Sequence, residues 1–247
     1  MDPRIRARRA EVRRRQGRRR LRTVVSAAVV ILVAGVGWGI LQSPWFSAEH
    51  LTIGGEVHTS KRAILRVSGL DNHPPLVTLN AGSAEAAIER LPWVSRAIVR
   101  KIWPSSVSVT IVERNAVALV RTAGNTWAEV DATGRILADA QAGLPVLASV
   151  TTRAAPGSYL GSGLIPALTV AAAIPPALSG KVASVSRVAD GQVDMSVQGP
   201  TGQVTVHVGP PTHLGAKMES LATVLASGSL AGVTVIDVTV PNLPVTS

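Results

Sequence analysis

The side chains that could do chemistry are few and widely spaced. The five histidines are His50, His58, His73, His207 and His213, and none lies three to five residues from another histidine with acidic residues around it. This spacing does not favour a histidine metal site. The chain has no cysteine. It therefore has no thiolate zinc site, iron–sulfur cluster, disulfide framework or cysteine nucleophile.

Two carboxylate pairs have the side chains that acid–base catalysis would need: Glu85 with Glu89, and Asp190 with Asp194. A glycoside hydrolase uses such a pair. We expect the first pair on the water-facing side of a helix and the second in a hairpin, so both are interpreted as solvated surface. The sequence contains no G-x-S-x-G, S-x-x-K or H-E-x-x-H motif and no acidic calcium loop. We therefore expect no catalysis, no cofactor, no metal ion and no small-molecule substrate.

The charge is concentrated at the N-terminus. Residues 1–22 hold 11 of the 25 Lys and Arg residues and two acidic residues, which leaves 14 basic and 13 acidic residues in the rest of the chain. The body is thus nearly neutral and has no basic face for a phosphate backbone. We expect no nucleic-acid partner, and we interpret residues 1–22 as a basic cytoplasmic tail.

An apolar segment follows the tail. Residues 23–41 contain no charged side chain, and a helix of 19 residues covers roughly 28 Å of a hydrocarbon layer about 30 Å thick. We expect a transmembrane helix over residues 23–43. A buried core helix and a cleaved signal peptide are the alternatives, but the run is longer than a usual signal core and ends in Pro44, Trp45 and Phe46 without a small-x-small site.

The arginine excess predicts the orientation of this span. Basic segments stay in the cytoplasm, so the N-terminus is expected inside and residues 46–247 outside. Trp45 and Phe46 are interpreted as an anchor at the membrane interface.

The pattern after the span predicts an α+β fold in two parts. The first part reads as strand 51–54, helix 59–67, helix 83–91, and strands 94–102 and 106–113, in the order β-α-α-β-β. In the second helix Ala84, Ala87, Ile88 and Leu91 form the inward face.

The second part is mainly β with two helices. Strands are expected at 116–122, 126–130, 135–138, 182–188, 192–197, 203–208 and 233–240, and helices at 164–174 and from Thr212 to about Gly228. Residues 143–152 and 156–163 read as connections.

Several short motifs together resemble the FtsQ/DivIB family of bacterial cell-division proteins. They are LPWV at 91–94, RKIWP at 100–104, VTIVER at 109–114, VDxxGR at 130–135, LPVL at 144–147 and VIDV at 235–238. The resemblance covers roughly residues 23–243. It implies a POTRA domain at 46–114, the family's β domain at 115–243 and a short tail at 244–247.

The resemblance further implies a non-enzymatic scaffold of the divisome, required for septum formation, at the division septum of the cell membrane. Its implied partners are FtsB/DivIC-like and FtsL-like bitopic proteins, with septal cell-wall synthases as further candidates. Two alternatives remain: a membrane-anchored cell-wall enzyme, which should carry a catalytic signature, and a POTRA-type export component, which should continue into a membrane β-barrel.

The final strand is the candidate partner-binding site. We expect residues 233–240 to form an edge strand that no later segment covers, because Pro241 and Pro244 prevent further pairing. A partner chain would add its own strand there. The alternative is an ordinary short edge that its neighbours in the chain close. The expected contact residues are Val233, Val235, Asp237, Thr239 and Val240, although the family often carries a basic or aromatic residue in this stretch.

Overall fold

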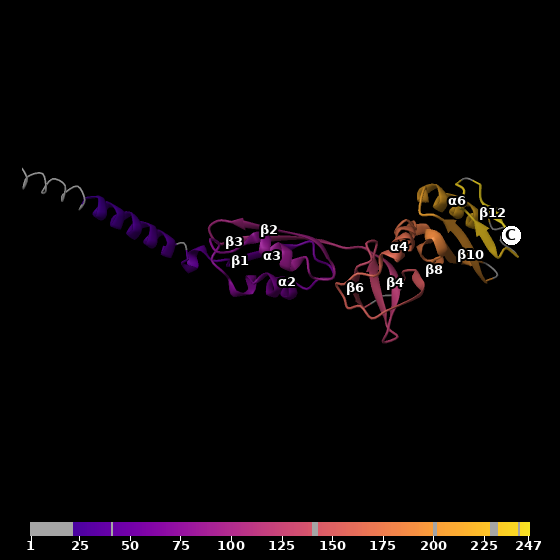
Figure 1. The fold of residues 1–247 in the computed structure, drawn as a ribbon, viewed down its shortest axis with the longest axis horizontal. Helices are drawn as coiled ribbons and strands as arrows, with labels where there is room; N and C mark the ends of the chain where they lie inside the picture. Colours follow the sequence, from indigo (N-terminus) through magenta and orange to yellow (C-terminus); the bar gives the residue numbers. More distant parts are fainter. Residues whose placement is uncertain (1–21, 41, 140–142, 200–201, 228–231, 242) are drawn as a thin grey trace, which may run out of the picture. The chain divides into compact units, whose positions relative to one another are not determined.

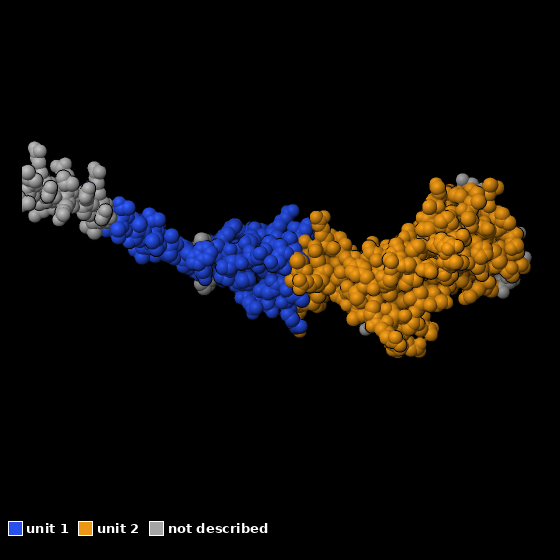
Figure 2. Space-filling model, viewed as in Figure 1, with its two compact units in different colours: residues 1–54, 65–85, 98–110 blue, residues 55–64, 86–97, 111–247 orange. Residues whose placement is uncertain are grey.

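The computed structural model describes residues 22–40, 42–139, 143–199, 202–227, 232–241 and 243–247. The chain divides into two compact units, shown in Figure 2. One comprises residues 1–54, 65–85 and 98–110, and the other comprises residues 55–64, 86–97 and 111–247. The predicted basic tail lies outside the described residues except for Arg22.

The predicted apolar segment is a helix over Arg22–Ile40. No part of it is buried against the rest of the chain. It is the one helix in the described residues that is long and apolar enough to cross a membrane. A short 3₁₀ turn, η1 (Pro44–Phe46), follows it.

The next elements form the predicted β-α-α-β-β unit (Figure 1). They are β1 (His50–Gly54), α2 (Lys61–Ser68), the 3₁₀ turn η2 (Leu70–Asn72), α3 (Ala81–Ile88), β2 (Val94–Ile102) and β3 (Ser106–Glu113). The three strands form one sheet in the order β1-β3-β2, with β1 parallel to β3. The predicted order is confirmed.

The strand β3 illustrates why the sequence predicted this unit. Val107, Val109 and Ile111 alternate along it and are buried, while the residues between them are more exposed. Helix α3 begins two residues earlier than the prediction, because the Asn80 side-chain oxygen accepts a hydrogen bond from the backbone N–H of Ser83 at 3.1 Å. Ile88 is fully buried on its inward face.

The first carboxylate pair is half-buried and not freely solvated as expected. Glu85 accepts a hydrogen bond from the backbone N–H of Val99 at 2.7 Å, and Glu89 accepts one from the N–H of Ala97 at 3.1 Å. Both donors belong to β2, the outer strand of its sheet. The two glutamates therefore cover the free edge of β2, where unpaired N–H groups would otherwise point outward.

The second part of the chain forms a nine-stranded sheet in the described residues. Its strands are β4 (Ala116–Thr122), β5 (Trp127–Asp131), β6 (Ile136–Asp139), β7 (Val146–Thr152), β8 (Val182–Arg187), β9 (Val193–Gly199), β10 (Gly202–Gly209), β11 (Val235–Asp237) and β12 (Val245–Thr246). The order is β12-β11-β10-β9-β8-β7-β4-β5-β6. Strand β7 lies within a segment that the sequence analysis interpreted as a connection, so that interpretation was wrong.

Three helices accompany this sheet: α4 (Ile165–Ala172), α5 (Pro176–Ser179) and α6 (Leu214–Ala226). Leu168 and Val170 of α4 and Met218 and Leu221 of α6 are buried in the same apolar core as the strands. The short helix α5 was not predicted. The two longer helices were, and the overall α+β class is confirmed.

Candidate functional site

The predicted partner-binding strand is shorter than expected. Of residues 233–240, only Val235–Asp237 are in a strand, β11, which runs parallel to β10 with Val235 beside Thr205 and Asp237 beside His207. Val233, Val235 and Asp237 are half-buried, whereas Thr239 and Val240 are exposed. The stretch is anchored through Ile236 and Val238, which are fully buried.

The expectation that no later segment covers this strand was wrong. Strand β12 pairs antiparallel with β11, with Thr246 opposite Ile236 and Val245 opposite Asp237. Ser247 exchanges backbone hydrogen bonds with Val235, at 3.0 Å from the Val235 N–H to the Ser247 oxygen and 3.1 Å in the other direction. A proline lacks only its own N–H. Pro244 therefore does not stop the two residues after it from pairing.

This covering strand is small and shallow. β12 has two residues, both exposed, and Val245 keeps 63% of its surface accessible. The neighbouring Leu243 is exposed as well. The edge of the large sheet is thus held by a few backbone hydrogen bonds, with little apolar burial to stabilise them.

The polar groups around β11 form two local contacts. The Asp237 carboxylate accepts the backbone N–H of Thr239 at 2.7 Å, and this bond, with help from the Thr239 side chain, lowers the pKa of Asp237 against the opposing effect of burial. The ring of His207 lies 2.8 Å from a carboxylate oxygen of Asp194. The second carboxylate pair of the sequence therefore has a histidine contact that its spacing did not indicate.

A buried lysine lies behind this edge. The Lys217 ammonium group of α6 donates hydrogen bonds to the carbonyl oxygens of Val208 at 2.8 Å and Pro210 at 2.9 Å. Burial lowers the pKa of Lys217, and the negative charge of Asp237 partly opposes that effect. Sequence reasoning missed this lysine, because the stripe of Leu214, Met218 and Leu221 indicated only an apolar face.

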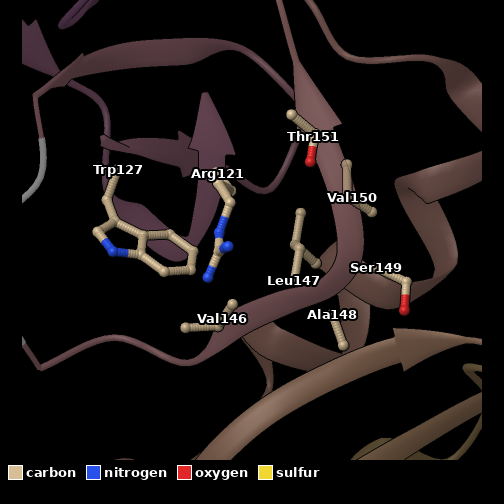
Figure 3. A pocket seen from close by; sticks show the side chains of 8 residues that line it. All are labelled: Arg121, Trp127, Val146, Leu147, Ala148, Ser149, Val150 and Thr151. Atoms are coloured by element: carbon tan, nitrogen blue, oxygen red, sulfur yellow. The ribbon is translucent and has the colours of Figure 1, made fainter. Parts of the chain in front are cut away.

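The first half of the sheet contains a groove where the pairing of β4 with β7 breaks (Figure 3). The register passes from Leu119 beside Val146 to Arg121 beside Thr151, so four residues of β7 lie opposite one of β4. The groove has a volume of about 410 Å³. The Arg121 guanidinium lies 4.9 Å from the centre of the Trp127 ring, a cation–π distance. Its lining residues include no carboxylate or histidine, so it offers no acid–base pair.

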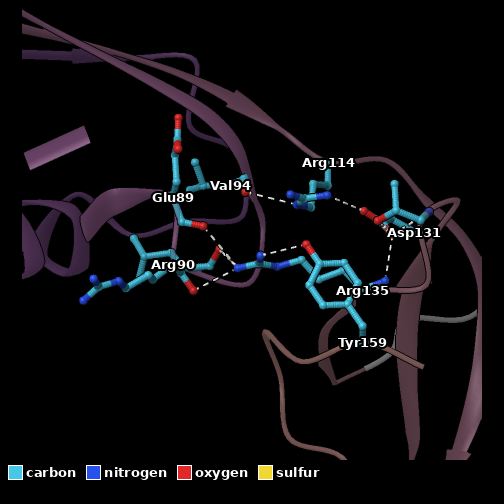
Figure 4. A network of polar contacts seen from close by, with 9 residues as sticks. Glu89, Arg90, Val94, Arg114, Asp131, Arg135 and Tyr159 are labelled. Carbon is cyan, nitrogen blue, oxygen red and sulfur yellow. Dashed lines mark hydrogen bonds and ion pairs between the residues drawn. The ribbon is translucent and has the colours of Figure 1, made fainter. Parts of the chain in front are cut away.

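A polar network surrounds the turn between β5 and β6 (Figure 4). The Asp131 carboxylate accepts a hydrogen bond from the Arg114 side chain at 2.7 Å and from the backbone N–H groups of Thr133 and Arg135 at 2.9 Å each. Burial alone would raise the pKa of Asp131, but these bonds and that from the Thr133 hydroxyl outweigh it, so the pKa is lowered.

The same turn contacts the residues after α3. The Arg135 guanidinium donates to the three consecutive carbonyl oxygens of residues 89–91 at 3.0–3.1 Å. It also donates to the Tyr159 hydroxyl at 3.3 Å. The VDxxGR motif is therefore a structural junction: its aspartate shapes the turn, Gly134 takes a φ of 85°, and its arginine contacts the chain that follows α3.

Among the described residues, no group of three or more His, Asp or Glu side chains could hold a metal ion. Three features of the described residues stand out beyond the apolar helix: the sheet edge at β11 and β12, the groove beside Arg121, and the junction around Asp131 and Arg135.

Comparison with known proteins gives two family matches. Residues 46–114 match the model described as "POTRA domain, FtsQ-type", and residues 118–239 match "Cell division protein FtsQ/DivIB, C-terminal". Similar curated proteins, each named "Cell division protein FtsQ", come from Streptomyces collinus (31% identical over 148 residues, 58% of this chain), Streptomyces venezuelae (32% over 112 residues, 45%) and Bartonella bacilliformis (33% over 99 residues, 40%). The chain spans 56%, 41% and 32% of the lengths of these three relatives.

Proposed function

Because this chain belongs to the FtsQ/DivIB family of non-enzymatic cell division proteins, we propose that it is a membrane-anchored scaffold of the divisome. Its partners are FtsB/DivIC-like and FtsL-like bitopic proteins, bound outside the cytoplasm at the septum. Septal cell-wall synthases are further candidate partners. The domain boundaries proposed for these roles are 1–22 for the tail, 23–43 for the span, 46–114 for the POTRA domain, 115–243 for the β domain and 244–247 for the final tail.

The membrane position rests on the helix Arg22–Ile40 and on the charge beside it. The helix is long enough to span, and the 11 arginines of residues 1–22 favour the cytoplasmic side. The span would then place the POTRA unit and the large sheet on the outer side, where bitopic partners carry their own exported segments.

The observation that carries the partner-binding proposal is the weakly held edge at β11. Backbone N–H and C=O groups of Val235 point away from β10, toward Ser247. A partner strand longer than β12 would pair with the same groups and with more of residues 233–240. In this proposal the partner strand displaces β12 and contacts Val233, Val235, Asp237, Thr239 and Val240.

Displacing β12 from β11 costs little free energy. The two residues of β12 are exposed, so displacement breaks backbone hydrogen bonds that each stabilise the fold by about 0.5–1.5 kcal/mol, and it exposes little apolar area. A partner strand restores those bonds. The buried side chains Ile236 and Val238 keep β11 on the sheet throughout.

Two valine-to-proline substitutions test the proposal. Val235→Pro removes an N–H that faces the edge and leaves β10 untouched, whereas Val245→Pro changes the strand that is displaced. Each full-length variant is purified from membranes in mild detergent, and the co-purified bitopic division proteins are quantified. We expect Val235→Pro to lose them and Val245→Pro to retain them.

A third variant distinguishes displacement from simple addition. Deleting residues 243–247 removes β12, so displacement predicts co-purification at or above the wild-type level. Loss of the partners on deletion would show that the partner pairs with β12 itself. A normally folded Val235→Pro protein that retains its partners would refute binding at this edge.

A further inference from the structure

Several exposed apolar side chains gather at the turn between β2 and β3. Ile102 and Trp103 lie at this turn, and each keeps 52% of its surface exposed. Trp45, in η1, is 82% exposed. The ring of Phe46, which is half-buried, lies 6.1 Å from the Trp103 ring and is tilted against it, so η1 contacts the turn. We call Trp45, Phe46, Ile102 and Trp103 the aromatic patch.

Backbone hydrogen bonds fix the two segments of this patch to one another. The N–H groups of Glu49 and His50 both donate to the carbonyl oxygen of Ser105, at 3.0 and 3.1 Å. Phe46 accepts a backbone bond from Leu76 at 2.8 Å, and Lys101 donates its ammonium group to the Leu76 carbonyl at 2.8 Å. These bonds join η1, the segment at Leu76 and the β2–β3 hairpin, whose strands are labelled in Figure 1.

Chain continuity brings this patch to the membrane. Trp45 follows the last residue of the apolar helix, Ile40, by only five positions. A 19-residue helix spans about 28 Å of the hydrocarbon core, and the headgroup region adds about 5–8 Å on each side. Five further residues therefore end within or next to that region, and the Phe46–Trp103 contact places the hairpin turn beside it.

The side chains of the patch suit this layer. Tryptophan rings, which are apolar with one N–H donor, are enriched where a protein crosses the headgroup region. Arg100 is exposed on the same hairpin, and its guanidinium group suits the phosphate groups of lipids. The acidic residue Glu49, whose N–H bonds to Ser105, is also exposed beside the turn. Water is a poor solvent for a cluster of this kind.

We propose that the β2–β3 turn is a second membrane anchor, with Ile102 and Trp103 inserted into the interfacial layer of the lipid bilayer. The span holds the chain in the membrane, and the turn holds the POTRA unit against its surface. This inference rests on the proposed membrane span, but the span does not require it.

The absence of cysteine allows a direct test by site-directed spin labelling. Single variants Ile102→Cys, Val112→Cys and Val36→Cys of the full-length protein are labelled with a nitroxide and reconstituted into phosphatidylcholine vesicles containing a minority of phosphatidylglycerol. Val112 is the matched control, because it lies in β3, the strand next to β2 in the sheet, and is 50% exposed, nearly as much as Ile102. Val36 lies in the apolar helix and reports on the span.

The readout is the accessibility of each nitroxide to oxygen, which concentrates in lipid, relative to a water-soluble nickel chelate. We expect the oxygen-to-nickel ratio to be several-fold higher at position 102 than at 112, and highest at 36. Equal ratios at 102 and 112, with a high ratio at 36, would overturn the second anchor and leave the span intact. A low ratio at 36 would overturn both.

Discussion

The carboxylate of Glu113 should make the stability of the POTRA unit depend on pH. It accepts hydrogen bonds from the backbone N–H groups of His58 and Thr59, at 2.9 and 2.8 Å, and its oxygen lies 2.9 Å from the His58 ring. The His58 ring in turn stacks on Trp93, with centroids 4.0 Å apart. Glu113 therefore joins the end of β3 to the segment before α2.

These hydrogen bonds change the proton affinity of the carboxyl group. Burial alone would raise the pKa of Glu113, but the bonds from His58 and Thr59 outweigh it and lower the pKa from 4.5 to about 2. The Glu113 side chain is 9% exposed but its partner His58 is 44% exposed, so solvent screens part of the effect. A fall of the pKa from 4.5 to about 2 corresponds to at most about 3 kcal/mol of stabilisation when the group is ionised in both states.

The sign follows from the depressed pKa. The stabilisation is fully present above the unfolded-state value of 4.5 and is lost as the pH falls through that value toward 2. At pH 3 about 40% of it remains. Glu113→Gln keeps the shape but not the charge, so the variant should be about 2–3 kcal/mol less stable at pH 7, and the difference from wild type should shrink below pH 4.

Urea unfolding of the detergent-solubilised full chain, followed through the fluorescence of a variant that retains only Trp93, measures this difference at pH 7, 5, 4 and 3. The control is Glu219→Gln, because Glu219 is exposed on α6. It should change the stability by less than about 0.5 kcal/mol at every pH. A Glu113→Gln effect that is the same at pH 7 and pH 3 would refute the reasoning.

Two further outcomes are expected at the buried cations. Arg135→Ala removes the donors to residues 89–91 and should lower the free energy of unfolding by about 2–4 kcal/mol. The control Arg121→Ala loses a cation–π contact at an exposed site and should cost about 1 kcal/mol or less. Urea unfolding compares the two variants, and equal losses would contradict a stabilising role for the Arg135 contacts. Lys217→Met leaves the carbonyls of Val208 and Pro210 without their donor and should cost about 1–3 kcal/mol in thermal unfolding; an unchanged melting temperature would show that water replaces the ammonium group.

The sequence was most informative where one periodic pattern decides an element. The alternation of Val107, Val109 and Ile111 predicted β3, and the uncharged run of residues 23–41 predicted the long helix. Such elements depend on the burial of one face, which single-chain periodicity reports directly.

The sequence was least informative where the role of a side chain or a strand depends on a contact with residues far away in the chain. Glu85 and Glu89 have the spacing of a solvated helix face, and only the position of β2 turns them into an edge cover. Strand β7 was missed because its pairing is interrupted and Ser149 has a φ of 59°, so no regular alternation develops.

The candidate edge shows the same limit. The alternation of Ile236, Val238 and Val240 predicts one inward face, and the structure buries the first two but exposes Val240. Strand β12 has two residues and follows a proline, so no pattern reveals it. The turn at Asp131 to Arg135 had a usable signal, since an Asp-x-x-Gly spacing predicts a tight turn. The contact of Arg135 with residues 89–91 had none.

The central claim, that a bitopic division protein pairs with the chain along residues 233–240, is tested most directly by site-specific photocrosslinking in dividing cells. A photoreactive residue is placed at Thr239, exposed beside β11, and in a second strain at Thr223, exposed on α6. The account predicts a crosslink from position 239 to a short single-span membrane protein, and none from position 223. Absence of that crosslink at 239 in cells whose variant protein supports division would contradict it.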